Sequence, residues 1–307
     1  MGKMTTAIRL MKKSRNAFFA AILENLNFIF ADKLYLQLMF RCKMGCKLNL
    51  NNPQTFNEKL QWLKLYNRDP LYTILVDKYS VKKWVAEKIG CENIIPTLGV
   101  WDSPNDIDFD NLPNQFVLKT TNGGGGDIVV CRDKSKFDRT NAVKHLNYSL
   151  KKNIYKKSRE WPYKNVPPRV IAEKYMEDES GELRDYKFFC FNGSVKALFI
   201  ATDRQKQNVD TKFDFYDRNF NHLPFTKGHP NADVAPQKPM CFERMINLAE
   251  ILSANIPHVR VDFYEVYGKV YFGEMTFFDN AGMVAFNPSV YDKIWGEWLN
   301  LPERWGD

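Results

Sequence analysis

Two acidic residues in the last quarter of the sequence have the type and spacing of a magnesium site. Asp262 lies in the apolar run Val259 to Val266, Glu274 lies in the next such run, and Tyr267-Gly268 separates the runs as a turn. Side chains alternate along a strand with period two, and the two acids are an even number of residues apart, so we expect both carboxylates on one face. Carboxylate oxygens on one face suit Mg²⁺. Acids on exposed strands are usually solvated. Asp262 and Glu274, however, have apolar neighbours, which favour a position in the wall of a cleft: Val261, Phe263, Phe272 and Phe277.

A glycine-rich segment follows a strand that ends in a lysine. The run Phe116 to Lys119 reads as a strand, and four glycines, Gly123 to Gly126, precede a second strand that begins at Ile128. A hairpin tip without side chains can lay its backbone N–H groups over polyphosphate oxygens, and Lys119 can supply a charge to the same group. The alternative is a mobile turn, since the segment is neither a Walker sequence nor a dinucleotide fingerprint.

Nucleophilic catalysis and structural zinc have little support in the sequence. The four histidines form no recognisable Ser/His/Asp or Cys/His grouping. The six cysteines have no disulfide-framework spacing, so we expect reduced thiols. Cys42 and Cys46 have the spacing of half a zinc site, but no second pair completes it.

The composition is that of a globular protein with a basic N-terminus. The chain has 307 residues, 44% hydrophobic and 26% charged, and no apolar run reaches the length of a membrane-spanning helix. Its net charge is +8, and residues 1–50 hold nine lysines and arginines against Glu24 and Asp32. Phe18, Ile22, Leu26 and Ile29 recur at helical spacing and predict an amphipathic helix rather than a signal peptide, so we place the protein in the cytoplasm.

Helices are expected first and strands later. Thr55 and Glu58 form a capping box that opens a helix to about Tyr66, and a second helix is expected from Pro70 to Lys88. Asn192-Gly193 predicts a hairpin turn. The fold class is α+β with antiparallel sheets. A last long helix is expected from Cys241 to Ala254. The expected strands are Ile94 to Val100, Phe116 to Thr120, Ile128 to Cys131, Val170 to Tyr175, Lys187 to Phe191, Val195 to Ile200, Val259 to Val266 and Lys269 to Met275.

The order of these motifs resembles the ATP-grasp ligases, from about Asp77 to Met283. In that superfamily a glycine loop after a strand lysine precedes a hinge strand, then R-x-D and E-x-N on neighbouring strands. Thr55 to Trp62 and Asp77-Lys78-Tyr79 narrow the resemblance to the TupA-like branch, named for teichuronopeptide synthesis. It implies an ATP-grasp fold of two α/β lobes gripping ATP after a helical N-terminal region, divided as 1–50, 51–115, 116–180 and 181–307.

The resemblance implies a role for each matching residue. Lys78 and Lys119 would contact the ATP phosphates, Gly123, Gly124, Gly125 and Gly126 would form a lid, and the hinge Glu173, Lys174, Tyr175 and Met176 would hold adenine. Asp262 and Glu274 would bind two Mg²⁺ ions. Thr276 stands where many relatives have a metal-binding Asn, and its hydroxyl or the nearby Asn280 could substitute. Lys187 and Arg204 would bring cations to the phosphates, and Arg260 would stabilise the tetrahedral state.

The implied reaction is ATP- and Mg²⁺-dependent ligation of a carboxylate to an amine through an acyl phosphate. The resemblance suggests a uronic-acid sugar of a bacterial surface polysaccharide as one partner and an amino acid or small amine as the other. Basic and aromatic residues from Lys151 to Arg169 could hold a polyanionic glycan, with Trp161 or Tyr163 stacking on sugars, or could be a solvated face. Residues 1–50 could touch anionic lipid at the inner face of the membrane.

Three other functions remain open. A glycosyltransferase would use a D-x-D motif, which Asp106 to Asp110 spells, but would leave Lys119, the glycines and the paired acids unexplained. A binding module is supported only by the basic patches, and nothing resembles a nucleic-acid motif, so we expect no nucleic-acid partner. A phosphotransferase on the same fold would have an identical nucleotide site.

Overall fold

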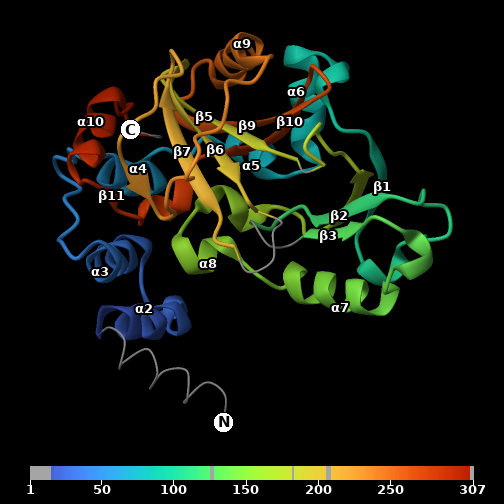
Figure 1. The fold of residues 1–307 in the computed structure, drawn as a ribbon. Helices are drawn as coiled ribbons and strands as arrows, with labels where there is room; N and C mark the ends of the chain where they lie inside the picture. The colour runs from blue at the N-terminus through green and yellow to red at the C-terminus, as the bar shows by residue number, and fades with distance from the viewer. Residues whose placement is uncertain (1–14, 125–127, 182, 205–208, 305–307) are drawn as a thin grey trace.

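The computed structural model describes residues 15–124, 128–181, 183–204 and 209–304, which form two antiparallel sheets surrounded by helices (Figure 1). The smaller sheet has four strands in the order β1-β4-β2-β3, and the larger has five in the order β10-β9-β5-β6-β7. The expectation of an α+β fold with antiparallel sheets is therefore confirmed. The strand bounds are β1 Thr97–Trp101, β2 Phe116–Thr120, β3 Ile128–Cys131, β4 Val170–Lys174, β5 Asp185–Phe191, β6 Ser194–Thr202, β7 Lys212–Asp217, β8 Thr226–Lys227, β9 His258–Val266, β10 Lys269–Thr276 and β11 Phe286–Asn287.

Most of the helices pack around the larger sheet. Their bounds are α2 Arg15–Asn25, α3 Asp32–Met44, α4 Phe56–Tyr66, α5 Leu71–Val76, α6 Ser80–Ile89, α7 Arg139–Leu150, α8 Ile154–Ser158, α9 Phe242–Ser253 and α10 Val290–Trp298. Within the described residues, no helix combines the length and the apolar content needed to cross a lipid bilayer. Helix α2 ends at Asn25, so Leu26 and Ile29 of the expected amphipathic helix lie beyond it, and α2 itself buries only Ala20.

Helix α4 begins where the sequence predicts it. The Thr55 side chain accepts from the backbone N–H of Glu58, and the Glu58 carboxylate accepts from the backbone N–H of Thr55. Two N–H groups that a helix start leaves unpaired are thereby satisfied. The predicted capping box is confirmed.

The single helix expected from Pro70 to Lys88 is wrong. The chain forms α5 and α6 instead, and the break falls at Asp77, whose backbone is extended. The Asp77 carboxylate then accepts from the Tyr79 N–H and the Ser80 hydroxyl, so it starts the second helix. The break leaves Lys78 between two helices, where its side chain can turn toward the sheets.

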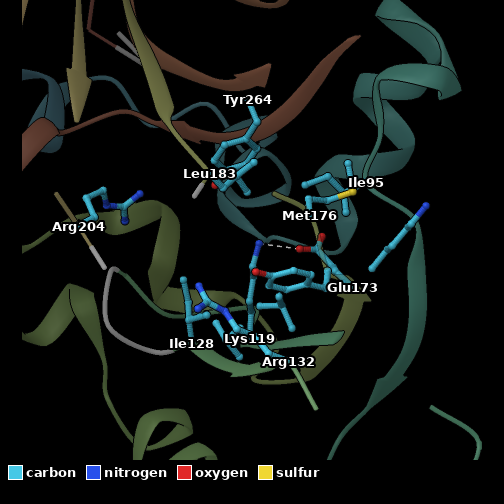
Figure 2. Close-up of a pocket in the computed structure, with 13 residues that line it drawn as sticks. Ile95, Lys119, Ile128, Arg132, Glu173, Met176, Leu183, Arg204 and Tyr264 are labelled. Carbon is cyan, nitrogen blue, oxygen red and sulfur yellow. Dashed lines mark ion pairs between the residues drawn. The ribbon is translucent and has the colours of Figure 1, made fainter. Parts of the chain in front are cut away.

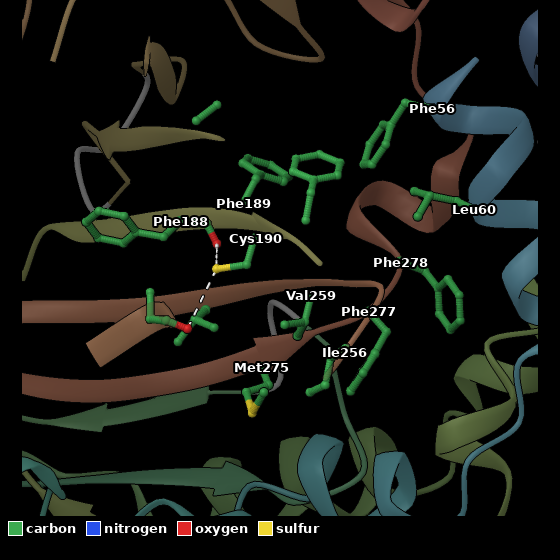
Figure 3. Close-up of a cluster of buried hydrophobic side chains, with 14 of the residues drawn as sticks. Phe56, Leu60, Phe188, Phe189, Cys190, Ile256, Val259, Met275, Phe277 and Phe278 are labelled. Atoms are coloured by element: carbon green, nitrogen blue, oxygen red, sulfur yellow. Dashed lines mark hydrogen bonds between the residues drawn. The ribbon is translucent and has the colours of Figure 1, made fainter. Parts of the chain in front are cut away.

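Strand β5 is central in the larger sheet and is buried along its whole length. On one face, Phe188 packs against Phe242 of α9, and the Cys190 thiol reaches the Ala249 carbonyl. On the other face, Phe189 packs against Trp295 of α10. Figure 3 shows this cluster with Phe56 and Leu60 of α4 close to the sheet. The apolar core therefore covers the sheet except where polar side chains of β5 and β9 gather.

The smaller sheet has its own core on the side of α7. Phe116 and Leu118 of β2 point into it and are fully buried, together with Leu146 of α7. Because side chains alternate along β2, Val117 and Lys119 point to the opposite face. That face looks toward the larger sheet.

The β9–β10 hairpin has an irregularity that decides where its acids point. Phe272 pairs with Phe263, but the next pair is Glu274 with Asp262, so Gly273 is an extra residue in β10. Continued without this bulge, the register would place Glu274 opposite Val261 and on the other face from Asp262. The predicted common face is therefore found, but the reason given for it was wrong, because even spacing across a two-residue turn places the two acids on opposite faces unless a bulge intervenes.

The predicted strands are found, most of them to within two residues, and the last long helix is α9. Asn192 and Gly193 both have positive φ, as do Tyr267 and Gly268, which is what two-residue hairpin turns require. Strands β7, β8 and β11 carry no strong local signal and were not predicted.

Candidate functional site

A cavity of about 630 Å³ lies between the two sheets. Figure 2 shows Lys119, Ile128 and Arg132 on one side and Leu183 and Tyr264 on the other. Apolar side chains from β2, β3 and β9 provide flat walls, and charged side chains lie at one end. The lining residues are Ile95, Val117, Lys119, Ile128, Val130, Arg132, Glu173, Lys174, Tyr175, Met176, Leu183, Arg204 and Tyr264.

Glu173 lies at the end of this cavity between two lysines. Its two carboxylate oxygens form ion pairs with Lys82 of α6 and with Lys119, the latter at 2.6 Å. Burial raises the pKa of Glu173, but Lys119 and Lys82 outweigh burial and hold it below its usual value. The segment from Lys174 to Met176, which follows Glu173, also lines the cavity. Contacts of these four residues with adenine remain a prediction.

A second hollow of about 60 Å³ continues from the charged end of the first. The two share Lys119, Ile128, Glu173, Arg204 and Tyr264. Three predicted phosphate-binding cations, Lys78, Lys119 and Lys187, line the smaller hollow with Arg204. Such a density of cations around a narrow space suits a polyphosphate.

Lys78 connects the glycine loop to the acid pair. Its ammonium donates to the Gly123 carbonyl at 2.6 Å and lies 3.6 Å from the Glu274 carboxylate. The backbone N–H of Lys78 also donates to the Thr121 carbonyl at 3.4 Å. The break between α5 and α6 therefore places one cation between the loop and β10.

Asp262 and Glu274 differ in exposure and in partners. The Asp262 carboxylate is buried, accepts from Arg260 Nε at 2.7 Å and also accepts from the Lys187 ammonium. Glu274 keeps 35% of its side chain exposed and lines the 60 Å³ hollow. Burial raises the pKa of Glu274, but Lys78, Lys187, Arg260 and Arg204 together hold it well below its usual value. Glu274 is therefore an ionised acid that a cation can reach.

Arg260 is held by acids on several sides. Its guanidinium donates to Asp262, to Glu274 at 3.1 Å and to Asp279 at 2.5 Å, and also to the Thr276 hydroxyl at 3.2 Å. Asp279 in turn accepts from the buried Lys227 at 2.5 Å. Burial opposes ionisation of Asp279, but Lys227 and Arg260 keep its pKa well below the usual value. The chain of charges fixes Arg260 against the acid pair.

Helix α4 supports the loop that follows β10. Lys64 donates to the Ala281 carbonyl at 2.7 Å and to the Ser158 carbonyl at 2.8 Å, and Gln61 donates to the Gly282 carbonyl at 2.8 Å. Lys64 and Gln61 are fully buried, and burial lowers the pKa of Lys64 to about 8. Ala281 has a left-handed backbone, which is unfavourable for a residue with a side chain. These side chains therefore hold a strained loop next to Thr276 and Asp279.

A third hollow of about 350 Å³ begins where the second ends, since both are lined by Gly124 and Glu274. It extends away from the nucleotide-sized cavity and is also lined by Arg260 and Thr276. The three hollows form one path past the acid pair.

The residues present can supply some of the oxygen ligands that Mg²⁺ needs, and substrate phosphates would supply others. Among the described residues, no group of three or more His, Cys, Asp or Glu side chains is placed to hold a metal ion. Mg²⁺ characteristically takes one or two protein carboxylates and completes its shell with water and substrate phosphates. Asp262 and Glu274 offer that number beside the cation-lined hollow. Both Asp262 oxygens already accept hydrogen bonds, but each carboxylate oxygen has two lone pairs.

The structure brings together most of the residues predicted for the site. Gly125 and Gly126 lie outside the described residues. Thr276 bonds Arg260, and Asn280 donates to Asp279 at 3.2 Å; metal binding by either remains a prediction. The D-x-D acids line none of the three hollows: Asp106, Asp108 and Asp110 are exposed.

The proposed stacking of Trp161 on sugars is wrong. Trp161 is buried, stacks on Tyr72 and donates to the Asn67 carbonyl at 3.1 Å. The basic segment from Lys151 to Arg169 is also partly held within the fold, since Arg159 is buried and forms an ion pair with Asp32 at 3.0 Å. Tyr163, by contrast, lines the 350 Å³ hollow.

Sequence reasoning missed several residues of the site. Asp185 and Tyr264 lie two positions from Lys187 and Asp262 on the same strands, so the period of two would have placed them on the same face. Lys227 and Lys82 come from distant segments, and no local pattern marks them. Gly273 was visible in the sequence, but its bulge was not considered.

Comparison with known proteins identifies the family of this chain. Residues 58–300 match a family model described as TupA-like ATPgrasp. No curated protein matches. Similar solved structures include D-alanine–D-alanine ligase from Bacillus anthracis, with 15% identity, 66% of this chain covered and a TM-score of 0.39. The same ligase from Helicobacter pylori has 15% identity, with 81% of this chain and 68% of that one covered and a TM-score of 0.41.

The match to a D-cycloserine synthetase has 16% sequence identity and a TM-score of 0.39, and it covers 67% of this chain and 63% of the synthetase. The chain spans 57% of the Bacillus anthracis ligase. The family match covers most of the sequence, from α4 to the end of α10, and includes every described residue of the acid pair and its cations. The chain belongs to the TupA-like ATP-grasp family.

Proposed function

We propose that this protein is an ATP- and Mg²⁺-dependent carboxylate–amine ligase. The observation that carries the proposal is the continuous path of three hollows, with cations around the narrow middle one and the Asp262–Glu274 pair at its junction with the third. A nucleotide fits the first hollow with its phosphates in the second. The third is then left for the groups that react with the terminal phosphate.

The reaction proceeds in two steps. A carboxylate oxygen of the substrate attacks the γ-phosphorus of ATP, the bond to the β-phosphate oxygen breaks, and ADP leaves an acyl phosphate behind. The amine nitrogen then attacks the acyl carbon, phosphate leaves, and the proton lost by nitrogen passes to solvent. Catalysis of this kind depends on positioning and electrostatics and needs no nucleophilic side chain.

Each charged residue has a proposed task in these steps. Lys78, Lys119, Lys187 and Arg204 bind and orient the phosphates, and the glycines from Gly123 to Gly126 have the proposed role of a lid. Asp262 and Glu274 would hold Mg²⁺, with Thr276 beside them, and the ion would supply charge to neutralise the phosphates. Arg260 is fixed by Asp279 and stabilises the negative oxygen of the tetrahedral state.

Membership of the TupA-like family supports a substrate class. We propose that the carboxylate belongs to a uronic-acid sugar of a surface polysaccharide and that the nucleophile is an amino acid or small amine. We place the reaction on the cytoplasmic side of the membrane, with residues 1–50 against anionic lipid. The exposed basic residues of the N-terminal helices support that contact.

Nucleotide product formation tests the proposal. Mg²⁺-ATP is incubated with uronic acids and amino acids in pairs, and ADP and phosphate are measured for the wild type, Glu274→Gln and Lys119→Ala. ADP release that requires both substrates and falls about 100-fold or more in both variants supports the ligase. Glu243→Gln is a matched control, since Glu243 is an exposed residue of α9. UDP release from a nucleotide sugar without ATP consumption would make the glycosyltransferase correct.

A further inference from the structure

The 350 Å³ hollow contains a buried acid that the proposed chemistry has not yet used. Glu160 is only 9% exposed and lines the hollow together with Ser158 and Tyr163. Its carboxylate accepts a hydrogen bond from the Ser158 hydroxyl at 2.7 Å. Within the part of the chain that the structure describes, no cation lies within ion-pair distance of it.

A buried carboxylate without a close counter-ion is costly. Burial raises the pKa of Glu160, and Lys64 and the Ser158 hydroxyl only partly oppose that effect. Lys64 itself donates to Gln61, to Ser158 and to Ala281, so its hydrogen-bonding capacity is used elsewhere. An external cation in the hollow would complete the environment of Glu160.

Charged side chains line the hollow at its junction and elsewhere. At the junction with the phosphate-sized hollow lie Arg260 and Glu274, where the acyl phosphate would form. The walls include Ile154, Tyr163 and Phe278, and Lys157 of α8 is exposed at the same hollow. Apart from Arg260 and Glu274 at the junction, the hollow offers one buried acid, Glu160, and one exposed cation, Lys157, which match a molecule that carries both an ammonium and a carboxylate.

We propose that this hollow binds the amine substrate as an amino acid, with its ammonium group against Glu160 and its carboxylate toward Lys157. The proposal rests on the ligase function proposed above and names the class of its nucleophile. Placing the nitrogen in this hollow puts it on the far side of the acid pair from the nucleotide. The bound ammonium first loses one proton to solvent, and the neutral amine can then attack an acyl group at Glu274 and Arg260 from this side.

Competition between two nucleophiles tests the assignment. Hydroxylamine is a small nucleophile that is neutral at pH 7 and traps an acyl phosphate as a hydroxamate. Glucuronate and galacturonate serve as acids, and glycine, L-alanine, L-glutamate and L-lysine serve as amines. For Glu160→Gln, we expect kcat/KM for the amino acid to fall about 10- to 100-fold further than kcat/KM for hydroxylamine, mainly through KM.

Two further variants separate binding from folding. Glu160→Asp keeps the charge and should show an intermediate loss, which keeps the test available if Glu160→Gln does not fold. Lys157→Met should raise KM for an amino acid but not for methylamine. Methylamine has no carboxylate, so it makes no contact that the loss of the Lys157 ammonium could remove. Glu243→Gln, on the surface of α9, should behave as wild type for every nucleophile.

The outcomes distinguish the two proposals. Hydroxamate formed by the wild type supports the ligase chemistry whatever Glu160 does, and its absence with every acid would overturn that chemistry. An equal loss with both nucleophiles would show that Glu160 only maintains the fold of the site. A rise in KM for the uronate alone would assign the hollow to the acid and overturn the amine assignment.

Discussion

Glu274 lies directly opposite Asp262 across the β9–β10 ladder because Gly273 is an extra residue in β10. The bulge turns Glu274 to the face that carries Asp262, Arg260 and Lys187, since Lys187 of β5 also pairs with Asp262 in register. A Cβ at Gly273 would lie 3.1 Å from the Asp262 carbonyl oxygen and 3.1 Å from the Tyr264 ring. The close approach of two strands at the bulge therefore favours glycine.

Gly273→Val is expected to impair the acid pair more than the fold. The branched side chain would crowd the Asp262 backbone and the Tyr264 ring, shifting Glu274 and weakening binding of Mg²⁺-ATP. We expect ATP turnover to fall at least about tenfold, with an unfolding cost of about 1–3 kcal/mol. Lys269→Val is the control, because it places the same branched side chain at an exposed position of the same strand, away from the hollows. Unchanged magnesium dependence of turnover in Gly273→Val would refute this role of the bulge.

Lys64→Met tests whether α4 holds the loop after β10. Methionine fills a similar volume but cannot donate to the Ser158 and Ala281 carbonyls, which would remain buried without that partner. We expect the free energy of unfolding in urea to fall by about 2–4 kcal/mol. Lys83→Met, on the exposed face of α6, should change it by less than about 0.5 kcal/mol. Equal stabilities for the two variants would contradict a supporting role for Lys64.

His258 is expected to make the protein less stable in acid. It is buried among Phe56, Phe189 and Phe191, and burial lowers its pKa from 6.5 to about 4. The unfolded chain therefore binds a proton at a higher pH than the folded chain. The stability that this difference contributes is complete above pH 6.5 and is lost as the pH falls toward 4.

His258→Phe should flatten this part of the pH dependence. The shift corresponds to about 3 kcal/mol between the two limits. Urea unfolding at several values of pH measures the slope of the free energy of unfolding against pH. The slope is more informative than the free energy itself, because the variant also loses the hydrogen bond to the Cys190 carbonyl at every pH. A variant with the wild-type slope would show that other groups cause the acid sensitivity.

Local patterns predicted the elements of the site better than its geometry. The capping box at Thr55, the Asn192-Gly193 turn and the strand before Lys119 each depend on neighbouring residues, and each is found where it was expected. The helix break at Asp77 was missed because Asp and Lys carry only a weak local signal against a helix. Yet that break is what turns Lys78 toward Gly123 and Glu274.

Long-range pairing explains what the sequence did not show. Lys227, from β8, neutralises Asp279, and Lys82, from α6, pairs with Glu173; in each case the partners are distant in the chain. Burial likewise depends on the whole fold, so the basic aromatic segment was read as a surface although Trp161 lies in the core. Only the assembled structure shows that Glu160 from the same segment lines a hollow.

The N-terminal helices offer a test of membrane contact. Phe28 and Ile29 follow α2 and are 78% and 62% exposed, in a region whose net charge is strongly positive. Apolar side chains beside cations bind anionic bilayers through both burial and electrostatic attraction. Deleting residues 1–30 should therefore weaken sedimentation with anionic vesicles while sparing ATP hydrolysis.

The double variant Phe28→Ser, Ile29→Ser isolates the apolar part of this contact. It should weaken sedimentation with anionic vesicles about tenfold, as expected from the loss of two inserted side chains, and should not change the low affinity for neutral vesicles. Val234→Ser is the control, since Val234 is 85% exposed on the segment before α9. If the double variant and the deletion both sediment like wild type, residues 1–30 do not contribute to lipid binding.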